Sequence, residues 1–160
     1  WVMSLHGGSG ASTLTGILGT LAASMPFRES LTSRRVTESP RSWPCGPGPA
    51  LASTVLLVAR THAAGLVAAD AAAHHWATGQ LIGIRLLGLV LVDDAPHLTG
   101  SQHAFMLQVA STVPNCWHLP WQEEWREIRT PSFNDASRRV RRIGTNIINC
   151  AREIRVTPER

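Results

Sequence analysis

The sequence predicts an α/β fold in which a small, mostly parallel β-sheet lies between two layers of helices. Residues 54–59 (TVLLVA) and 86–92 (LLGLVLV) are continuous apolar runs, which are typical of strands buried on both faces of a parallel sheet. Helical patterns alternate with these runs, as they do in layered α/β domains. A basic amphipathic pattern closes the chain. The 160 residues suffice for one compact domain with an appendage.

The first elements surround a glycine-rich turn. Residues 1–5 are an apolar run, residues 6–10 read HGGSG, and an apolar helical period begins at Ser12 or Thr13. This order predicts a strand, a loop and a helix. Residues 24–53 then hold five of the ten prolines and no sustained period, so we expect a long exposed loop there.

The sequence of residues 54–119 predicts two further pairs of a strand and a helix, followed by a short last strand. After the strand at residues 54–59, an alanine-rich helix is expected over residues 63–79, where Gly79 ends it. The strand at residues 86–92 precedes a helix at about residues 101–111 and a strand at residues 116–119.

The last segment predicts helices only. Residues 121–129 (WQEEWREIR) favour a helix, and a second helix starts near Ser137. Its apolar residues recur at spacings of three and four. They are Val140, Ile143, Ile147, Cys150, Ala151 and Ile154. We therefore divide the chain into an α/β domain, residues 1–121, and a helical, basic C-terminal appendage, residues 122–160.

Composition excludes several classes of protein. No apolar stretch approaches the ~18 residues of a transmembrane helix, so we expect no membrane span. All 15 basic residues are arginine, which excludes chemistry that needs a lysine amine. Cys45, Cys116 and Cys150 are odd in number and widely spaced, which argues against a disulfide framework or a zinc site. A reducing cytoplasm is the expected location.

The glycine-rich turn is the main candidate site. A turn of this kind between a buried strand and a helix directs backbone N–H groups at a concavity where the helix dipole favours an anion. Residues 5–12 match the P-loop pattern GxxxxGK[ST] only at Gly10 and Ser12. The turn therefore predicts a site for a phosphate-sized anion.

Residues 6–13 (HGGSGAST) resemble the deviant Walker A motif of ParA/MinD-type ATPases, KGGxGK[ST]T. The GGxGAST form is similar to the degenerate CpaE-type pilus-assembly proteins and to a short actinobacterial family of unknown function. With residues 54–61, 88–96 and 113–121, the resemblance covers most of residues 1–121. It implies a reduced sheet of P-loop NTPase type and ATP with magnesium as the possible cofactor. The phosphate-binding residues it implies are Gly7, Gly8, Ser9, Gly10, Ala11, Ser12 and Thr13, with Ser12 as the metal ligand if Mg-nucleotide binds.

The departures from this family concern catalysis. His6 and Ala11 stand where the motif has its two lysines. Residues 24–53 contain no aspartate where the family has switch and Walker B carboxylates. Losing the loop lysine removes a charge-assisted contact worth about 1.5–3 kcal/mol. We therefore expect a non-hydrolysing accessory or scaffold protein in localisation, secretion or conjugation, with a weak nucleotide-binding ATPase as the alternative.

A second alternative uses Ser9 as a nucleophile. Residues 7–11 (GGSGA) approximate the GxSxG nucleophile elbow, although Ala11 replaces the last glycine. Asp93 or Asp94 followed by His118 gives the order serine, acid, histidine. A small serine hydrolase therefore stays open, against Ser9 as a small loop residue.

Other side chains at the predicted sheet edge could complete an anion site. Arg60 ends a strand and could supply a cation that the loop lacks, or form a surface ion pair. Asp93 and Asp94 follow another strand and could line a ligand crevice or stop the strand. The neighbouring His74 and His75 point about 100° apart on a helix, so we propose no metal there.

The C-terminal segment offers a second kind of surface. Trp117, Trp121 and Trp125 recur every four residues, which on a helix predicts one face in a core or interface. From Arg126 onward nine arginines face four acidic residues, so the net charge of +4 belongs to the tail. The helix could bind a protein partner, nucleic acid or an anionic membrane surface, or simply dock on its own domain. The interaction residues expected are Arg138, Arg139, Arg141 and Arg142.

Overall fold

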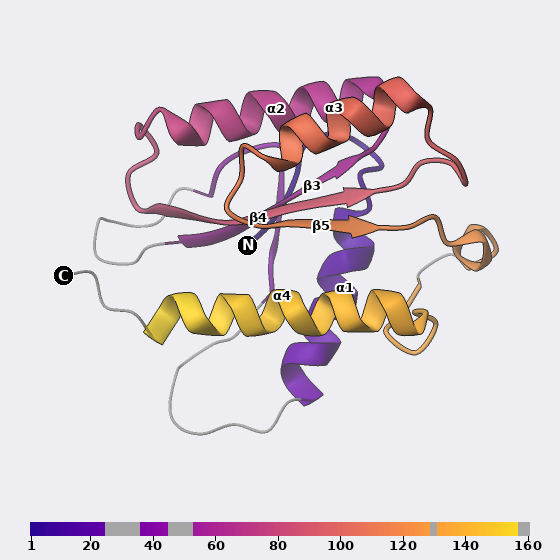
Figure 1. The fold of residues 1–160 in the computed structure, drawn as a ribbon. Coiled ribbons are helices and arrows are strands. Elements are labelled where there is room, and N and C mark those ends of the chain that lie inside the picture. Colours follow the sequence, from indigo (N-terminus) through magenta and orange to yellow (C-terminus); the bar gives the residue numbers. More distant parts are fainter. Residues whose placement is uncertain (25–35, 45–52, 129–130, 157–160) are drawn as a thin grey trace.

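The computed structural model describes residues 1–24, 36–44, 53–128 and 131–156. Among these, five strands form one all-parallel sheet in the order β2-β1-β3-β4-β5 (Figure 1). The strands are β1 (Val2–Ser4), β2 (Glu38–Pro40), β3 (Ser53–Arg60), β4 (Ile84–Val92) and β5 (Cys116–Leu119). The α/β class and the parallel sheet are therefore confirmed.

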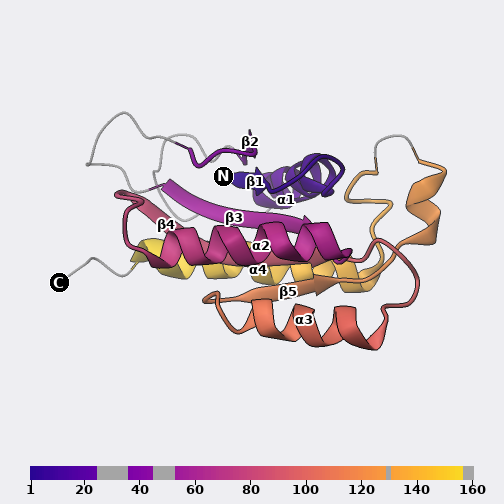
Figure 2. The ribbon, with the colours of Figure 1, turned by 90° about the horizontal axis from the view of Figure 1, so that it is seen from above.

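Four α-helices cover the two faces of the sheet. They are α1 (Ala11–Ser24), α2 (Ala63–Ala77), α3 (Gly100–Ala110) and α4 (Arg138–Val156). Helices α2 and α3 contact each other on one face, and α1 and α4 contact each other on the opposite face (Figures 1 and 2). The result is the three-layer arrangement expected from the sequence.

An apolar core lies on each face of the sheet. In β3 successive side chains point to opposite faces, so Leu56 and Val58 pack toward α1 and α4. Val55, Leu57 and Ala59 pack toward α2 and α3. All five are buried, which explains why the segment is apolar without alternation.

Gly88 lies next to an irregularity in the pairing of the central strands and allows β5 to approach β4 closely. The register of β3 with β4 shifts between Val55 and Leu56. A Cβ atom on Gly88 would collide with the carbonyl oxygen of Asn115 and lie 2.7 Å from the ring of Trp117. Any side chain here would therefore push β5 away from β4.

The prediction of a long exposed loop at residues 24–53 is wrong in part, because Glu38–Pro40 forms β2 beside β1. Three residues with a serine and a proline give no apolar period, and an edge strand needs few ladder bonds. Pro26, Pro47 and Pro49 lie outside the described residues.

The prediction of a regular helix at residues 121–129 is also wrong. Only a 3₁₀ turn forms, at Glu123–Arg126, and Arg129 lies outside the described residues. Pro120 and Pro131 leave too few residues between them for a stable helix. Trp117 therefore lies in β5 and Trp125 in the 3₁₀ turn, so the spacing of four does not place the tryptophans on one helix face.

The C-terminal helix α4 is an integral part of one layer. Its residues Val140 and Ile147 are 1% exposed and share a core with α1. A Cβ atom on Gly144 would lie 2.7 Å from Leu21, so the two helices approach closely at this glycine. Trp117 donates a hydrogen bond from Nε1 to Oδ1 of Asn146 over 2.7 Å, which links β5 to α4. The segment predicted as an appendage, residues 122–160, thus contributes α4 to the core of residues 1–121.

Within the described part of the chain, no helix has the length and apolarity that crossing a membrane requires.

Candidate functional site

The glycine-rich loop lies where the chain leaves two neighbouring strands in opposite directions. β1 and β3 are adjacent in the sheet. After β1 the chain enters α1 on one face, and after β3 it enters α2 on the other. In parallel α/β sheets ligands bind at such a point, outside the carboxyl ends of the strands.

Hydrogen bonds inside the loop fix its shape. The Ser4 hydroxyl donates to the carbonyl oxygen of His6 over 2.8 Å. Oγ of Ser9 lies 3.0 Å from Oγ of Ser4 and accepts from the Ala11 amide over 3.3 Å. Gly8 and Gly10 have φ values of 73° and 91°, which residues other than glycine rarely adopt.

This shape leaves a group of backbone amides unused at the start of α1. None of them has a hydrogen-bond acceptor within the described residues. They belong to Gly7, Gly8, Gly10, Ser12 and Thr13. Successive amide groups of this kind, at the positive end of a helix dipole, form a concave site for an anion.

Arg60 lies against the loop, as its position at the end of β3 predicted. Its Nε atom donates to the carbonyl oxygen of Gly8 over 3.0 Å, and Nη1 donates to the carbonyl oxygen of Asp93 over 3.1 Å. The guanidinium is thereby fixed in place, and Nη2 has no acceptor in the part of the chain that the structure describes, so its donors remain for a ligand.

Two histidines that were not candidates join the loop to β3 and α2. Nε2 of His6 accepts from the amide of Arg60 over 2.9 Å. Nδ1 of His62 accepts from the amide of Gly65 over 2.9 Å and so caps α2. The two rings lie 4.8 Å apart. His6 could have been noticed because it occupies the position of the first motif lysine.

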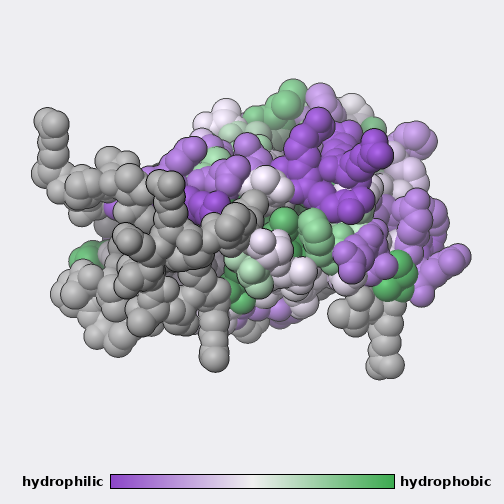
Figure 3. Space-filling model, turned by 90° about the horizontal axis from the view of Figure 1, so that it is seen from below, coloured by the Kyte–Doolittle hydropathy of each residue, from purple (hydrophilic) through white to green (hydrophobic). Residues whose placement is uncertain are grey.

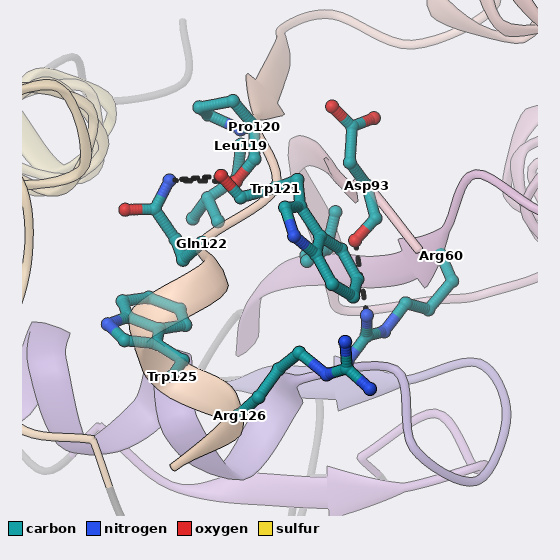
Figure 4. Close-up of a pocket in the computed structure, with 9 residues that line it drawn as sticks. Arg60, Asp93, Leu119, Pro120, Trp121, Gln122, Trp125 and Arg126 are labelled. Carbon is teal, nitrogen blue, oxygen red and sulfur yellow. Dashed lines mark hydrogen bonds between the residues drawn. The ribbon is translucent and has the colours of Figure 1, made fainter. Parts of the chain in front are cut away.

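The two aspartates after β4 are engaged by other protein groups. Oδ1 of Asp93 lies 2.7 Å from Nε2 of His118. Oδ1 of Asp94 accepts from the Thr61 hydroxyl over 2.9 Å. In Figure 4 the carboxylate of Asp93 points away from the carbonyl oxygen that binds Arg60. Asp93 therefore meets the site through its backbone.

The structure brings together two of the three groups required for a serine hydrolase. Asp93 and His118 form a pair, whereas the Ser9 hydroxyl bonds to Ser4 and to the amide of Ala11. Ser9 is only 2% exposed. Nothing in this arrangement activates Ser9 as a nucleophile.

A small cavity of about 180 Å³ lies beside Arg60 at the ends of β4 and β5. The guanidinium of Arg126 lies 5.9 Å from the centroid of the Trp121 ring and pairs with Glu123 over 3.3 Å. Figure 4 shows the lining side chains around this cavity. They are Arg60, Val92, Asp93, Leu119, Pro120, Trp121, Gln122, Trp125 and Arg126.

The predicted interaction residues begin α4. Arg138, Arg139 and Arg142 are exposed, while the guanidinium of Arg141 lies 5.8 Å from the centroid of the Phe133 ring. None of the four has an ion pair within the described residues. Figure 3 shows hydrophilic side chains gathered on the α1 and α4 face, on the side where α4 begins.

No cluster of three histidine, cysteine, aspartate or glutamate side chains that could hold a metal ion occurs among the described residues. Cys116 is a partly buried thiol in β5, and burial raises its pKa to about 11. Its thiol is therefore protonated at neutral pH.

Comparison with protein-family models matches residues 1–143 to a family of unknown function, DUF6668. Neither the curated proteins nor the solved structures include a match to this chain.

Proposed function

The chain belongs to the DUF6668 family, and we propose that it is a non-hydrolysing accessory or scaffold protein of ParA/MinD type whose glycine loop binds a phosphate group. The resemblance of residues 6–13 to the deviant Walker A motif supports this proposal. So does the strand, loop and helix order around that motif.

The observation that carries the proposal is the set of unused amides at the start of α1. Five N–H groups around Gly8 and Gly10 point to no acceptor in the described part of the chain. Arg60 stands beside them with donors of its own. A phosphate group would satisfy these donors, because its oxygens accept several hydrogen bonds at once.

The side chains present favour binding over hydrolysis. Ala11 replaces the motif lysine, and His6 uses Nε2 to hold the Arg60 amide. Asp93 and Asp94 are engaged with His118 and Thr61. Of the groups that the resemblance assigns to a magnesium ion, only the Ser12 hydroxyl is present at the loop. The residues thus fit the phosphates of ATP and do not fit its metal ion.

The arginines at the start of α4 are the surface that we propose for a partner. Their exposed charge suits a polyanion or an acidic protein. The apolar side chains Val140 and Ile147 of the same helix are already buried in its own core, so that side of α4 is not available to a partner.

Calorimetry with ATP, ADP and pyrophosphate, together with an assay for phosphate release, tests the proposed function. We expect saturable binding of pyrophosphate and no turnover. Turnover on the order of 1 per second that Ser12→Ala abolishes would establish the weak ATPase instead. Absence of binding to all three probes would contradict the phosphate loop.

A matched pair of glycine variants separates the loop from general damage to the fold. Gly8 and Gly79 have the same φ of 73°, and a Cβ atom on either would meet nothing within 4 Å. Gly8→Ala and Gly79→Ala therefore introduce the same backbone strain, one in the loop and one after α2. Only Gly8→Ala should weaken pyrophosphate binding.

A further inference from the structure

Arg41 is held beside the glycine loop in a strained backbone conformation. It follows β2, and its amide donates to the carbonyl oxygen of Ser4 in β1 over 2.9 Å. Its φ of 56° makes it the only non-glycine residue with positive φ in the described part of the chain. Such strain persists where the surrounding structure imposes it, and it clusters at functional sites.

The guanidinium of Arg41 occupies the space that a side chain at Gly7 would need. A Cβ atom on Gly7 would lie 2.8 Å from Nη2 of Arg41, and among the described residues, its chain neighbours apart, no other heavy atom would come within 4 Å of it. The absence of a side chain at Gly7 therefore makes room for this arginine. No hydrogen bond or ion pair occupies the guanidinium among the described residues.

Arg41 and Arg60 approach the loop from the two strands that flank β1. Arg41 follows β2 on one side, and Arg60 ends β3 on the other. Arg60 is bonded to Gly8, the residue after the one that Arg41 contacts. Two guanidinium groups thus converge on the backbone that carries the unused amides.

We propose that Arg41 and Arg60 form a two-arginine clamp for a terminal phosphate group carrying two negative charges. The clamp supplies the cations that the two missing lysines would have given. A guanidinium stays charged at any physiological pH and binds phosphate oxygens through two donors at once. Five amides and two guanidiniums offer more donors than a carboxylate can accept, which favours phosphate. This inference rests on the proposed phosphate loop.

The first test measures pyrophosphate binding by calorimetry for the unmodified protein, Arg41→Gln and Arg152→Gln. Arg152 lies in the second half of α4, and its replacement removes the same charge far along the chain from the loop. We expect Arg41→Gln to weaken binding about 10- to 100-fold, the loss typical of one charge-assisted contact. Arg152→Gln should change affinity less than about twofold, the scale of a screened distant charge.

The outcomes separate the clamp from the phosphate loop. Pyrophosphate binding that is equal in the unmodified protein and in Arg41→Gln would overturn the clamp and leave the loop standing. An equal loss in Arg41→Gln and Arg152→Gln would also overturn it, since net charge would then be the cause. If the unmodified protein binds none of pyrophosphate, ATP and ADP, the proposed function fails and the clamp fails with it.

Two further variants exclude a merely structural role for Arg41. Glycine tolerates φ of 56°, so Arg41→Gly should raise the midpoint of urea denaturation while weakening pyrophosphate binding as Arg41→Gln does. Gly7→Ala alone should displace the guanidinium and weaken binding. In the Arg41→Gly background the same Gly7→Ala change should alter affinity less than about twofold, because the group that it displaces is gone. A full additional loss in that background would show that Gly7 serves the ligand directly and would overturn the claim that it makes room for Arg41.

Discussion

The amide of Arg60 donates a hydrogen bond to Nε2 of His6 over 2.9 Å, although the two residues lie 54 positions apart. Because Nε2 is the acceptor, the ring proton of the neutral imidazole resides on Nδ1. From there it can bond to the carbonyl oxygen of Gly7, 2.9 Å away. One imidazole therefore connects the end of β3 to the glycine loop.

Replacing this imidazole should loosen the loop and the fold together. His6→Ala leaves the Arg60 amide without its acceptor and should lower the free energy of unfolding by about 1–3 kcal/mol. Urea denaturation measures the change. His103→Ala is the matched control, because His103 is exposed on α3 and its side chain has no hydrogen bond among the described residues. Equal stability of the two variants would contradict the role of His6.

Gly65 should not accept even the smallest side chain. Its Cβ atom would collide with the backbone carbonyl of Arg60 and lie 3.0 Å from Nε2 of His6. Although alanine favours helices, this overpacking should make Gly65→Ala destabilising by about 1–3 kcal/mol. Gly19→Ala in α1 meets nothing within 4 Å and should instead stabilise the fold by about 0.5–1 kcal/mol. Thermal or urea denaturation of the two variants measures both changes in the free energy of unfolding, a decrease for Gly65→Ala and an increase for Gly19→Ala.

The arginines at the start of α4 should control binding to polyanions. Replacing Arg138, Arg139, Arg141 and Arg142 by glutamine should reduce retention on DNA or anionic lipid and flatten its salt dependence. The fold should persist by circular dichroism, because Val140 and Ile147 hold the helix from its other side. Unchanged retention, or no salt-dependent retention by the unmodified protein, would show that α4 only packs against its own domain.

Cys116 should react slowly with thiol reagents in the folded protein. Burial raises its pKa to about 11, so at pH 8 only about one thiol in a thousand is ionised. In urea the pKa of the thiol returns to about 8.5. Alkylation of Cys116, followed on its own peptide, should therefore be faster in urea than in the folded protein. Because the pKa of Cys116 is higher in the folded than in the unfolded protein, its neutral thiol contributes fully to the free energy of unfolding below about pH 8.5. This contribution is lost as the pH rises toward 11. Rapid labelling of the folded thiol at pH 8 would contradict this account.

The sequence predicted those parts of the fold that depend on local pattern. The strands β3 and β4 are continuous apolar runs because both faces of the sheet are covered, and the pattern carries that information. The strand β2 has no such pattern, because its three residues are Glu38, Ser39 and Pro40, and what identifies it is its pairing with β1. The segment around Glu123–Arg126 has the composition of an α-helix, but it is too short for these residue preferences to stabilise one, so only a 3₁₀ turn forms there.

The residues of the candidate site also fall into those that the sequence predicted and those that it did not. The glycine loop is contiguous, so its residues could be named from the sequence. Arg60 could be placed near it because parallel strands end at one edge. The contact of Arg41 with Gly7 depends on β2, which the sequence did not reveal. The pairing of Asp93 with His118 depends on the register of β4 and β5.

The packing of α1 against α4 has a consequence for how the protein is made. The apolar side of α1 contacts a helix that begins more than a hundred residues later. During synthesis, Leu18 and Leu21 have no α4 to cover them until nearly the whole described chain has left the ribosome. Folding that depends on such distant contacts is slow and exposes apolar surface meanwhile. We therefore expect the nascent chain to recruit chaperones until α4 emerges, and translation stalled before Arg138 to yield an aggregation-prone product.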